Sequence, residues 1–390
     1  MERWPGILFT CKPVTMANIE INTLSPVHVG SGRFLMSKLE YVFGKEKIGI
    51  VDERKTMDII GEDRMASWVS SIEKGESLIT FLKGFDIKPT LQQLSSRQVM
   101  IACDKTRALD LSTLKEQIHN GKGLPYIPGS SIKGAIRSAI YNQMIRSSNR
   151  PVSDFKLKRN NRDYSGSKLE SEMFGSDPNH DVFRFLRVGD AYFEPNSTIA
   201  MIMDNLNLRG NAQHPDASFD TSKNQLVEAI APKKKAGFSL QLDQQGIKTV
   251  KTNGYINHFP ECFDSIQKLF GLINRNTKKL LEEEKSIWSE FQSDPADEYI
   301  ARIENLLEMT EKCQEGECIL RLSHGSGWRF ITGDWIYDDH LVSNDSYQGI
   351  IDQARPRNER YRDFIFPKSR RISSETELPG FVKLSIAKDE

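Results

Sequence analysis

Alternating apolar and polar residues predict strands at both ends of the chain. The stretch from Ile19 to Gly32 reads IEINTLSPVHVGSG, which places Ile19 and Ile21 on one face before a glycine-containing loop. Residues 47–60 read as a second strand that leads into a helix. Strand patterning returns in residues 317–335, and the segment that ends near residue 386 reads as a short final strand.

Helical periodicity dominates two other regions. Residues 62–120 are expected to be largely helical, most clearly in 65–74 and 112–120. Residues 263–292 and 297–312 read as two amphipathic helices.

The middle of the chain predicts hairpins. Segments 181–195 and 197–205 alternate as paired strands would, and 209–224 reads as a loop or a long hairpin tip. Segments 225–232 and 236–243 form a further expected hairpin. Strands interleaved with helices and hairpins indicate an α+β fold with antiparallel sheets.

The stretch LPYIPGSSIKGAIRSAI, residues 124–140, combines a turn with a helix start. Pro128 and Gly129 suit a type II turn, and Ser130 or Ser131 could cap the helix. Two cations follow, Lys133 and Arg137, with Gly134 between them. Free N–H groups, hydroxyls and cations at a helix start suit a phosphate, and an ordinary capped surface helix is the alternative.

A second stretch, HGSGWRFITG, has its glycines at 325, 327 and 333 and also contains Ser326 and Arg329. Such glycines let a backbone approach a ligand and form an anion-binding concavity. The spacing matches neither the dinucleotide fingerprint nor a P-loop.

A third stretch, SPVHVGSGR, carries His28 at a strand end, followed by Gly30, Ser31, Gly32 and Arg33. His28 could act as an acid or base in RNA cleavage. A histidine that packs or hydrogen-bonds at the strand end is the favoured interpretation, because no motif places a second catalytic group.

Composition narrows the function classes. The 390 residues suit one large domain or two ordinary ones, and 53 basic residues balance 53 acidic ones. Any polyanion site must therefore be a local patch, and a neutral balance fits a subunit of a larger assembly. Five cysteines without a CxxC pair favour reduced thiols in the cytoplasm, and Cys262, Cys313, Cys318 and His324 match no zinc spacing. We expect no cofactor and no metal.

Membrane insertion is not expected, because no run is long and apolar enough to span a bilayer. Residues 1–16 do not read as a signal peptide and are expected to form a loose extension.

Together the three stretches resemble the RAMP superfamily of CRISPR proteins. LPYIPGSSIKGAIRSA is similar to its Pro-x-x-Pro-Gly-Ser-Ser-x-Lys-Gly-x-x-Arg motif, and HGSGWRFITG is similar to its late glycine-rich loop. LSPVHVGSG, LRVGDAYF and LPGFVKLSI are similar to further landmarks. Their order and spacing are most similar to the fifth-subunit family of type III-A Csm effector complexes. One departure is His324, where the loop usually has an apolar residue.

The resemblance implies a ferredoxin-like (RRM-type) RAMP fold with antiparallel sheets, helical insertions and a degenerate second half. The expected domains are an extension (1–16), a ferredoxin-like domain with insertions (17–260), and a helical segment with a C-terminal RAMP half (261–390). The implied function is non-catalytic binding of crRNA at its 3′ end, in support of maturation and assembly. The implied partners are crRNA, target RNA near the guide 3′ end, backbone RAMP subunits, the small helical subunit and a host trimming nuclease.

The expected RNA contacts follow from the same motifs. They comprise the helix start (Ser130, Ser131, Lys133, Gly134, Arg137), the late loop (Gly325, Ser326, Gly327, Arg329) and the early loop (His28 and Gly30 to Arg33). The basic, aromatic-containing tail of residues 355–371 adds Arg357 and Arg360, whereas the basic loop of residues 155–168 reads better as solvated.

Three alternatives remain open at this stage. The chain could be a repeat-cleaving RAMP endoribonuclease that uses His28. It could be the subunit that binds the crRNA 5′ tag, or an end subunit of the related Cmr complex. It could also be a RAMP scaffold that has lost RNA binding.

Overall fold

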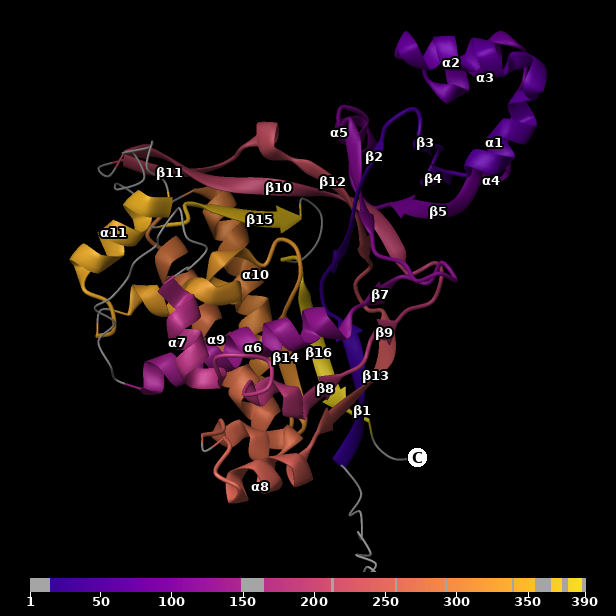
Figure 1. The fold of residues 1–390 in the computed structure, drawn as a ribbon. Helices are drawn as coiled ribbons and strands as arrows, with labels where there is room; N and C mark the ends of the chain where they lie inside the picture. The colour runs from indigo at the N-terminus through magenta and orange to yellow at the C-terminus, as the bar shows by residue number, and fades with distance from the viewer. Residues whose placement is uncertain are drawn as a thin grey trace, which may run out of the picture.

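The computed structural model of the chain describes residues 15–148, 165–211, 214–256, 258–291, 293–338, 340–354, 366–373 and 378–387. Two large sheets, a short two-stranded sheet and a layer of helices make up the described molecule, and a small helical segment stands apart from them (Figure 1).

The first sheet has five strands, all antiparallel to their neighbours. In sheet order they are β14 (Glu317–Arg321), β16 (Phe381–Ile386), β1 (Thr15–Thr23), β13 (Lys235–Leu242) and β8 (Leu186–Val188). Along the chain, α6 (Gly129–Ser147) lies between β1 and β8, and α9 (Ile266–Trp288) lies between β13 and β16. Strands β8, β13, β1 and β16 therefore have the arrangement of a ferredoxin-like βαββαβ unit, with β14 added at its edge.

The main core lies between this sheet and its helices (Figure 1). Ile19 and Ile21 of β1 are buried with Ile132 and Ile136 of α6 and with Leu269 of α9. The stripe at i and i+4 in α6 thus packs as its periodicity predicts. A second helix, α10 (Asp294–Glu311), packs on α9, where the ring centroids of Trp288 and Tyr299 lie 4.9 Å apart.

The second sheet has nine strands arranged around a long central one, β10 (Thr198–Asn211). Its order is β2 (Gly30–Met36), β6 (Thr113–Gln117), β12 (Gln225–Ile230), β10, β5 (Ser95–Ile101), β4 (Lys47–Val51) and β3 (Tyr41–Phe43); β11 (His214–Phe219) and β15 (Ser369–Ser373) also pair with β10. A separate short pair joins β7 (Tyr126–Ile127) to β9 (Ala191–Tyr192).

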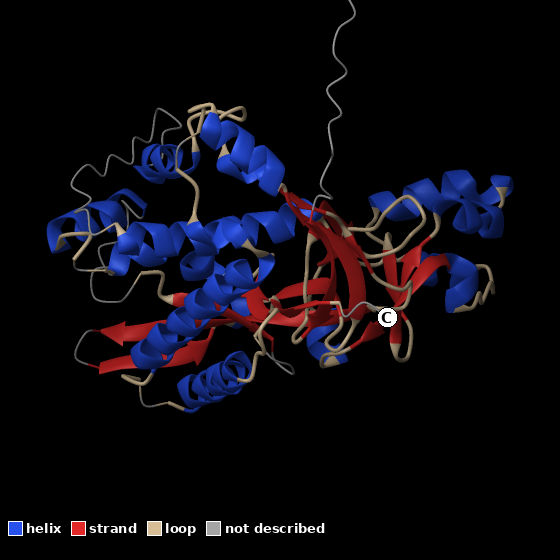
Figure 2. Cartoon of the chain, turned by 90° about the horizontal axis from the view of Figure 1, so that it is seen from below, coloured by secondary structure: helices blue, strands red, loops and turns tan. Residues whose placement is uncertain are grey.

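Four short helices are inserted between β4 and β5: α1 (Glu53–Ile60), α2 (Met65–Glu73), α3 (Leu78–Gly84) and α4 (Leu91–Leu94). They have a small core of their own that includes Ile60, Leu78 and Leu82. They project away from the helices that cover the five-stranded sheet, as both views show (Figures 1 and 2). The remaining helices are α5 (Lys105–Leu109), α7 (Ser165–Phe174), α8 (Gln244–Thr252) and α11 (Asn344–Ala354).

Several predicted elements are confirmed. They are β1, the strand and helix of 47–60, the hairpin β10–β11, helices α9 and α10, and the final strand β16. Segment 112–120 was wrongly expected to be helical, because its core is β6, which pairs with β2 and β12. Segments 181–195 and 197–205 do not pair with each other, since β8 joins β13 and β9 joins β7.

The expected hairpin of segments 225–232 and 236–243 is also wrong. β12 lies in the nine-stranded sheet and β13 in the five-stranded one, so the lysine-containing turn between them crosses from sheet to sheet. The last part of segment 317–335, expected to be extended, is not: a π-helical turn, η5 (Arg329–Gly333), and a 3₁₀ turn, η6 (Asp334–Tyr337), occupy it.

The expected division at residue 260 is not reflected in the sheets. The five-stranded sheet takes β1, β8 and β13 from one side of that point and β14 and β16 from the other. The proposed extension lies outside the described residues except for Thr15 and Met16, which belong to β1. Within the described part of the chain, no helix is long and apolar enough to cross a bilayer.

Candidate nucleic-acid interface

Helix α6 begins two or three residues earlier than a cap at Ser130 or Ser131 would place it. Pro128 is the N-cap and Gly129 the first helical residue, and the Gly129 N–H donates to Asp190 Oδ1 at 2.7 Å. Neither serine caps the helix, and Gly129 lacks the positive φ that a type II turn needs. A Cβ at Gly129 would lie 2.2 Å from the Val188 carbonyl oxygen, so glycine is required here for close packing.

The two cations of α6 have different surroundings. Arg137 pairs with Glu170 at 2.6 Å and with Asp181 at 2.9 Å, and its guanidinium lies over the rings of Phe174 and Phe183. This arginine therefore holds α6 to its neighbours.

Lys133 is half-buried and forms no ion pair within the described ranges. Burial lowers its pKa. It lines an open pocket of about 550 Å³ together with Ser130 and Gly134. Of the two cations, Lys133 is the one positioned to meet a ligand, and Ser131 is partly buried and does not line this pocket.

Two glycines of the late loop adopt a left-handed backbone conformation. Gly325 and Gly327 have φ values of 88° and 79°, which favour glycine. The side chains of the loop point elsewhere: Ser326 is buried and donates to the Ser323 carbonyl at 2.7 Å. Arg329 is 4% exposed and forms ion pairs with Glu283 and Asp334, so it stabilises the interior.

The early loop opens onto the surface at the start of β2. Gly30, Ser31 and Gly32 are exposed, and Gly32 has a φ of 89°. Ser31 donates to Glu116 Oε2 at 2.9 Å. The exposed Arg33 side chain lies 3.3 Å from Glu40.

The early and late loops meet at a pair of histidines. The His324 N–H donates to the His28 carbonyl at 3.2 Å, and the two rings are edge to face with centroids 5.5 Å apart. His28 is 2% exposed, and its Nδ1 lies 2.6 Å from the Glu228 carbonyl oxygen. Burial lowers the pKa of His28. This geometry agrees with the packing interpretation of His28.

A buried glutamine links this point to the strand before α6. The Val29 N–H donates to Gln117 Oε1 at 2.9 Å, and Gln117 Nε2 donates to the Tyr126 carbonyl at 3.1 Å. The three sequence stretches are thus connected through β6.

Positive charge gathers around His324. Lys115 Nζ lies 3.4 Å from His324 Nε2, and Gln225 Oε1 lies 3.1 Å from the same atom. Burial, followed by the charges of Lys115, His28 and Arg371, lowers the pKa of His324 to about 4. Burial and Arg371 also lower the pKa of Lys115. We call Lys115, His324 and Arg371 the cationic junction.

The cationic junction is only partly neutralised by the described residues, because burial lowers the pKa of Arg371 and the charges of Asp220 and Asp204 raise it against that effect. Neither Lys115 nor Arg371 has a described carboxylate within ion-pair distance; Arg371 instead donates to the Lys223 carbonyl at 2.6 Å. An exposed aromatic lies alongside, because Lys115 Nζ is 5.5 Å from the ring centroid of Phe34, which is 57% exposed. Unpaired cations beside an exposed ring suit the phosphates and bases of single-stranded nucleic acid.

Lys115 and Phe34 were missed from the sequence. Lys115 lies in the segment read as helix, and Phe34 was not distinguished from its neighbours in β2. Of the basic tail, Arg371 belongs to the junction, whereas Arg370 is buried and bonds Glu284 at 2.7 and 2.8 Å. Arg357, Arg360 and the basic residues 156–162 lie outside the described residues.

A metal site receives no support in the described ranges, where no group of three or more His, Cys, Asp or Glu side chains could hold an ion. Among the described residues, the structure places none of Cys103, Cys262, Cys313 and Cys318 in a disulfide.

The family model of the RAMP superfamily matches residues 20–328, and the chain belongs to this superfamily. Among curated proteins, the chain is similar to Csm5, a CRISPR system protein of Streptococcus thermophilus, with 27% identity over 187 residues. That match covers 44% of this chain and 50% of the relative, so it spans about half the length of each.

Two solved structures share the fold over nearly the whole chain. One is a chain of the type III-A Csm–crRNA–target RNA ternary complex, with a TM-score of 0.72, 18% identity and coverage of 95% of this chain and 100% of that one. The other is T. onnurineus Csm5, with a TM-score of 0.60, 17% identity and coverage of 93% and 99%. The expected RAMP fold with antiparallel sheets and helices is thereby confirmed.

Proposed function

We propose that this protein is a non-catalytic crRNA-binding subunit of a type III-A Csm complex that caps the crRNA 3′ end. The observation that carries the proposal is the fold shared with a chain of the Csm–crRNA–target RNA complex over almost the full length of both. The similarity to the Streptococcus thermophilus Csm5 sequence supports the same assignment.

The cationic junction supplies the chemistry that this function needs. Lys115, Arg371 and the N–H groups of the two glycine-containing loops can hold phosphates, and Phe34 can stack on a base. Such contacts do not depend on sequence, which suits a guide that changes from spacer to spacer. Lys133, in its open pocket at the start of α6, would offer one more cation to the RNA.

The proposed partners are those of a filament end. They are crRNA, target RNA near the guide 3′ end, the backbone RAMP subunits and the small helical subunit, together with a host nuclease that trims the 3′ end. The assembly would act in antiviral defence in the cytoplasm.

The geometry of His28 argues against the endoribonuclease alternative. A side chain that is 2% exposed cannot reach a ribose hydroxyl without movement of the loop around it. Incubation of the purified protein with repeat RNA tests this directly, with His28→Ala for comparison. Cleavage by the wild type that the variant loses would establish the enzyme instead.

The proposed function is tested by recovery of the chain with its natural RNA. We would co-express it with its genomic neighbours, purify through a tag on this chain and sequence the bound RNA. We expect backbone subunits and small RNAs with one repeat-derived 5′ end and variable 3′ ends. Recovery of the chain without RNA would overturn the proposal and favour a scaffold.

Position in the assembly separates the remaining alternatives. Complexes that lack this chain should lose mature 3′ ends while their 5′ tags stay intact. Loss of the 5′ tag instead would identify a tag-binding subunit, and co-purification with Cmr subunits would identify an end subunit of that complex.

A further inference from the structure

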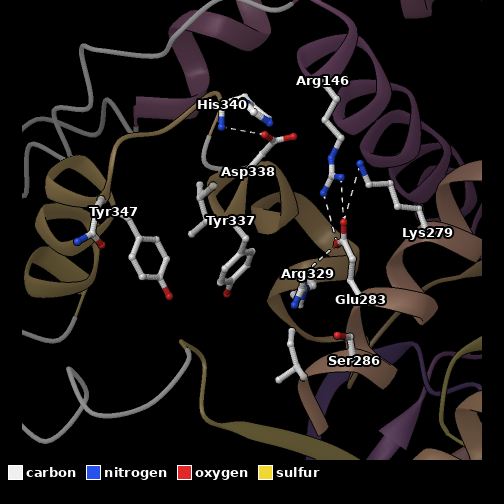
Figure 3. Close-up of a pocket in the computed structure, with 12 residues that line it drawn as sticks. Arg146, Lys279, Glu283, Ser286, Arg329, Tyr337, Asp338, His340 and Tyr347 are labelled. Carbon is white, nitrogen blue, oxygen red and sulfur yellow. Dashed lines mark hydrogen bonds and ion pairs between the residues drawn. The ribbon is translucent and has the colours of Figure 1, made fainter. Parts of the chain in front are cut away.

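A second polar pocket lies between α9, η6, α11 and the end of α6, and Arg329 of the late glycine stretch lines it. It has a volume of about 580 Å³, within the range of small-molecule sites. Arg146, Lys279, Arg329 and Tyr337 are among the residues that line it (Figure 3).

The floor of this pocket is a buried ion network with one unused donor. Arg329 Nε donates to Asp334 at 3.0 Å and its Nη2 donates to Glu283 at 2.8 Å. Its Nη1 has no hydrogen-bond partner among the described residues, although the side chain is 4% exposed. An unpaired buried guanidinium nitrogen is costly, so an acceptor from a ligand would stabilise it.

Further donors face the same space. Lys279 Nζ lies 3.9 Å from Glu283, too far for a hydrogen bond, and its side chain is 43% exposed. The Tyr337 hydroxyl has no partner among the described residues. Glu283, the carboxylate nearest to these cations, already accepts from both Arg146 and Arg329. The wall therefore offers unfilled donors, while its carboxylates are Glu283, which is in use, and Asp338, which accepts from the His340 N–H at 3.1 Å.

Aromatic and apolar side chains adjoin these donors, and the Arg329 guanidinium lies 4.4 Å from the ring centroid of Tyr337. The rings of Tyr337 and Tyr347 have centroids 5.7 Å apart, and Ile287 and Ile336 add apolar surface. Figure 3 shows both tyrosine hydroxyls and the Arg329 guanidinium turned toward one open space. A ligand that fits has an anionic, acceptor-rich group at one end and a flat ring at the other.

We propose that this pocket binds a nucleoside monophosphate group, with the phosphate held by Lys279, Arg329 and the Tyr337 hydroxyl and the base against Tyr347. The group can belong to a free nucleotide or to a phosphorylated end of RNA, since both present the same chemistry. The site is separate from the cationic junction and does not depend on it.

Isothermal titration calorimetry of the full chain tests the proposal, with AMP, adenosine and a short RNA that carries a terminal phosphate. The RNA titrations use the Lys115→Gln variant, so that binding at the cationic junction is weakened. We expect AMP, the phosphorylated RNA end, or both to bind saturably, and the unphosphorylated counterpart to bind at least about tenfold more weakly. Binding of AMP identifies a free nucleotide as a ligand, and binding of the RNA alone identifies its phosphorylated end. The absence of saturable binding by both would overturn the proposal.

Two adjacent lysines of α9 provide matched variants. Lys279→Met should weaken binding about tenfold, whereas Lys278→Met should not, because Lys278 pairs with Glu282 and Glu311 outside the pocket. Lys115→Gln should also leave AMP binding unchanged, which separates this site from the cationic junction. Equal affinities for Lys279→Met and Lys278→Met would overturn the assignment.

Discussion

Whether a basic residue of the sequence motifs can bind a polyanion depends on the ion pairs that this residue already forms. Arg137 and Arg329 lie in the two most informative motifs, yet both are committed to internal carboxylates. Lys115 is unmarked in the sequence and has no described ion partner. The sequence shows where a cation stands but not whether it forms an ion pair. Glu170 and Asp181 are distant from Arg137 in the sequence and meet it only in the folded chain.

Lys115→Gln should weaken binding of single-stranded RNA and reduce the slope of log K against log salt by about one, because one phosphate contact is lost. Fluorescence anisotropy at several salt concentrations measures both quantities. Lys74→Gln, at the exposed end of α2, is the matched control and should leave the slope unchanged. An unaltered slope for Lys115→Gln would remove this lysine from the interface.

His324 should make the stability of the protein depend on pH. Its pKa in the folded protein is about 4, below the ordinary value of 6.5. The folded state therefore binds fewer protons than the unfolded state between these values, and stability falls as the pH falls from about 6.5 toward 4.

Replacement of this histidine isolates its contribution. The melting temperature of His324→Gln should fall less than that of the wild type between pH 7 and pH 5, as measured by thermal unfolding. Parallel curves for the two proteins would show that His324 does not contribute.

At the scale of elements, the spacing of apolar residues predicted those helices and strands whose buried face repeats regularly along the segment. The stripes of α6 and α9 and the alternation of β1 and β16 were readable because burial repeats along each segment. The start of α6 could not be predicted in this way, because the N–H of its first residue donates to Asp190, 61 positions away in the sequence. Lys115 stood in a segment read as helix because the pairing of β6 with β2 and β12 is not local.

Two glycines of α6 should respond oppositely to substitution by alanine. Gly134→Ala should stabilise the free protein by about 0.5–1 kcal/mol, because nothing lies within 4 Å of the added Cβ and alanine favours helix. Gly129→Ala should destabilise it by about 1–3 kcal/mol, because its Cβ would overlap the Val188 carbonyl.

Chemical denaturation of both variants measures these differences. Stabilisation by Gly129→Ala would contradict the close packing at the start of α6. If RNA approaches α6 at Gly134, Gly134→Ala should also bind RNA more weakly although it is more stable.

At the scale of the whole molecule, the helical insertion of α1 to α4 is separable from the sheets. The Asp52 N–H donates to the Leu94 carbonyl at 2.8 Å, and Val51 pairs with Ser95, so the chain leaves and re-enters the sheet at neighbouring positions. The insertion has its own small core. Sequence reasoning placed helices here but could not show that they form a separate unit.

Replacement of residues 53–93 by Asn-Gly should leave the rest of the molecule folded, because this dipeptide closes a two-residue hairpin between β4 and β5. We expect circular dichroism to lose helical signal while thermal unfolding stays cooperative. A variant that aggregates or unfolds without cooperativity would show that the insertion supports the sheets.

The position of β16 has a consequence for synthesis of the chain. Strand β1 lies between β13 and β16, and the Phe381 N–H reaches Ser25 Oγ across 356 positions of sequence. At about 5–20 residues per second, a ribosome needs roughly 20–70 s to make the intervening chain. Throughout that interval one edge of β1 is unpaired, so the nascent protein depends on protection from chaperones until its last strand emerges.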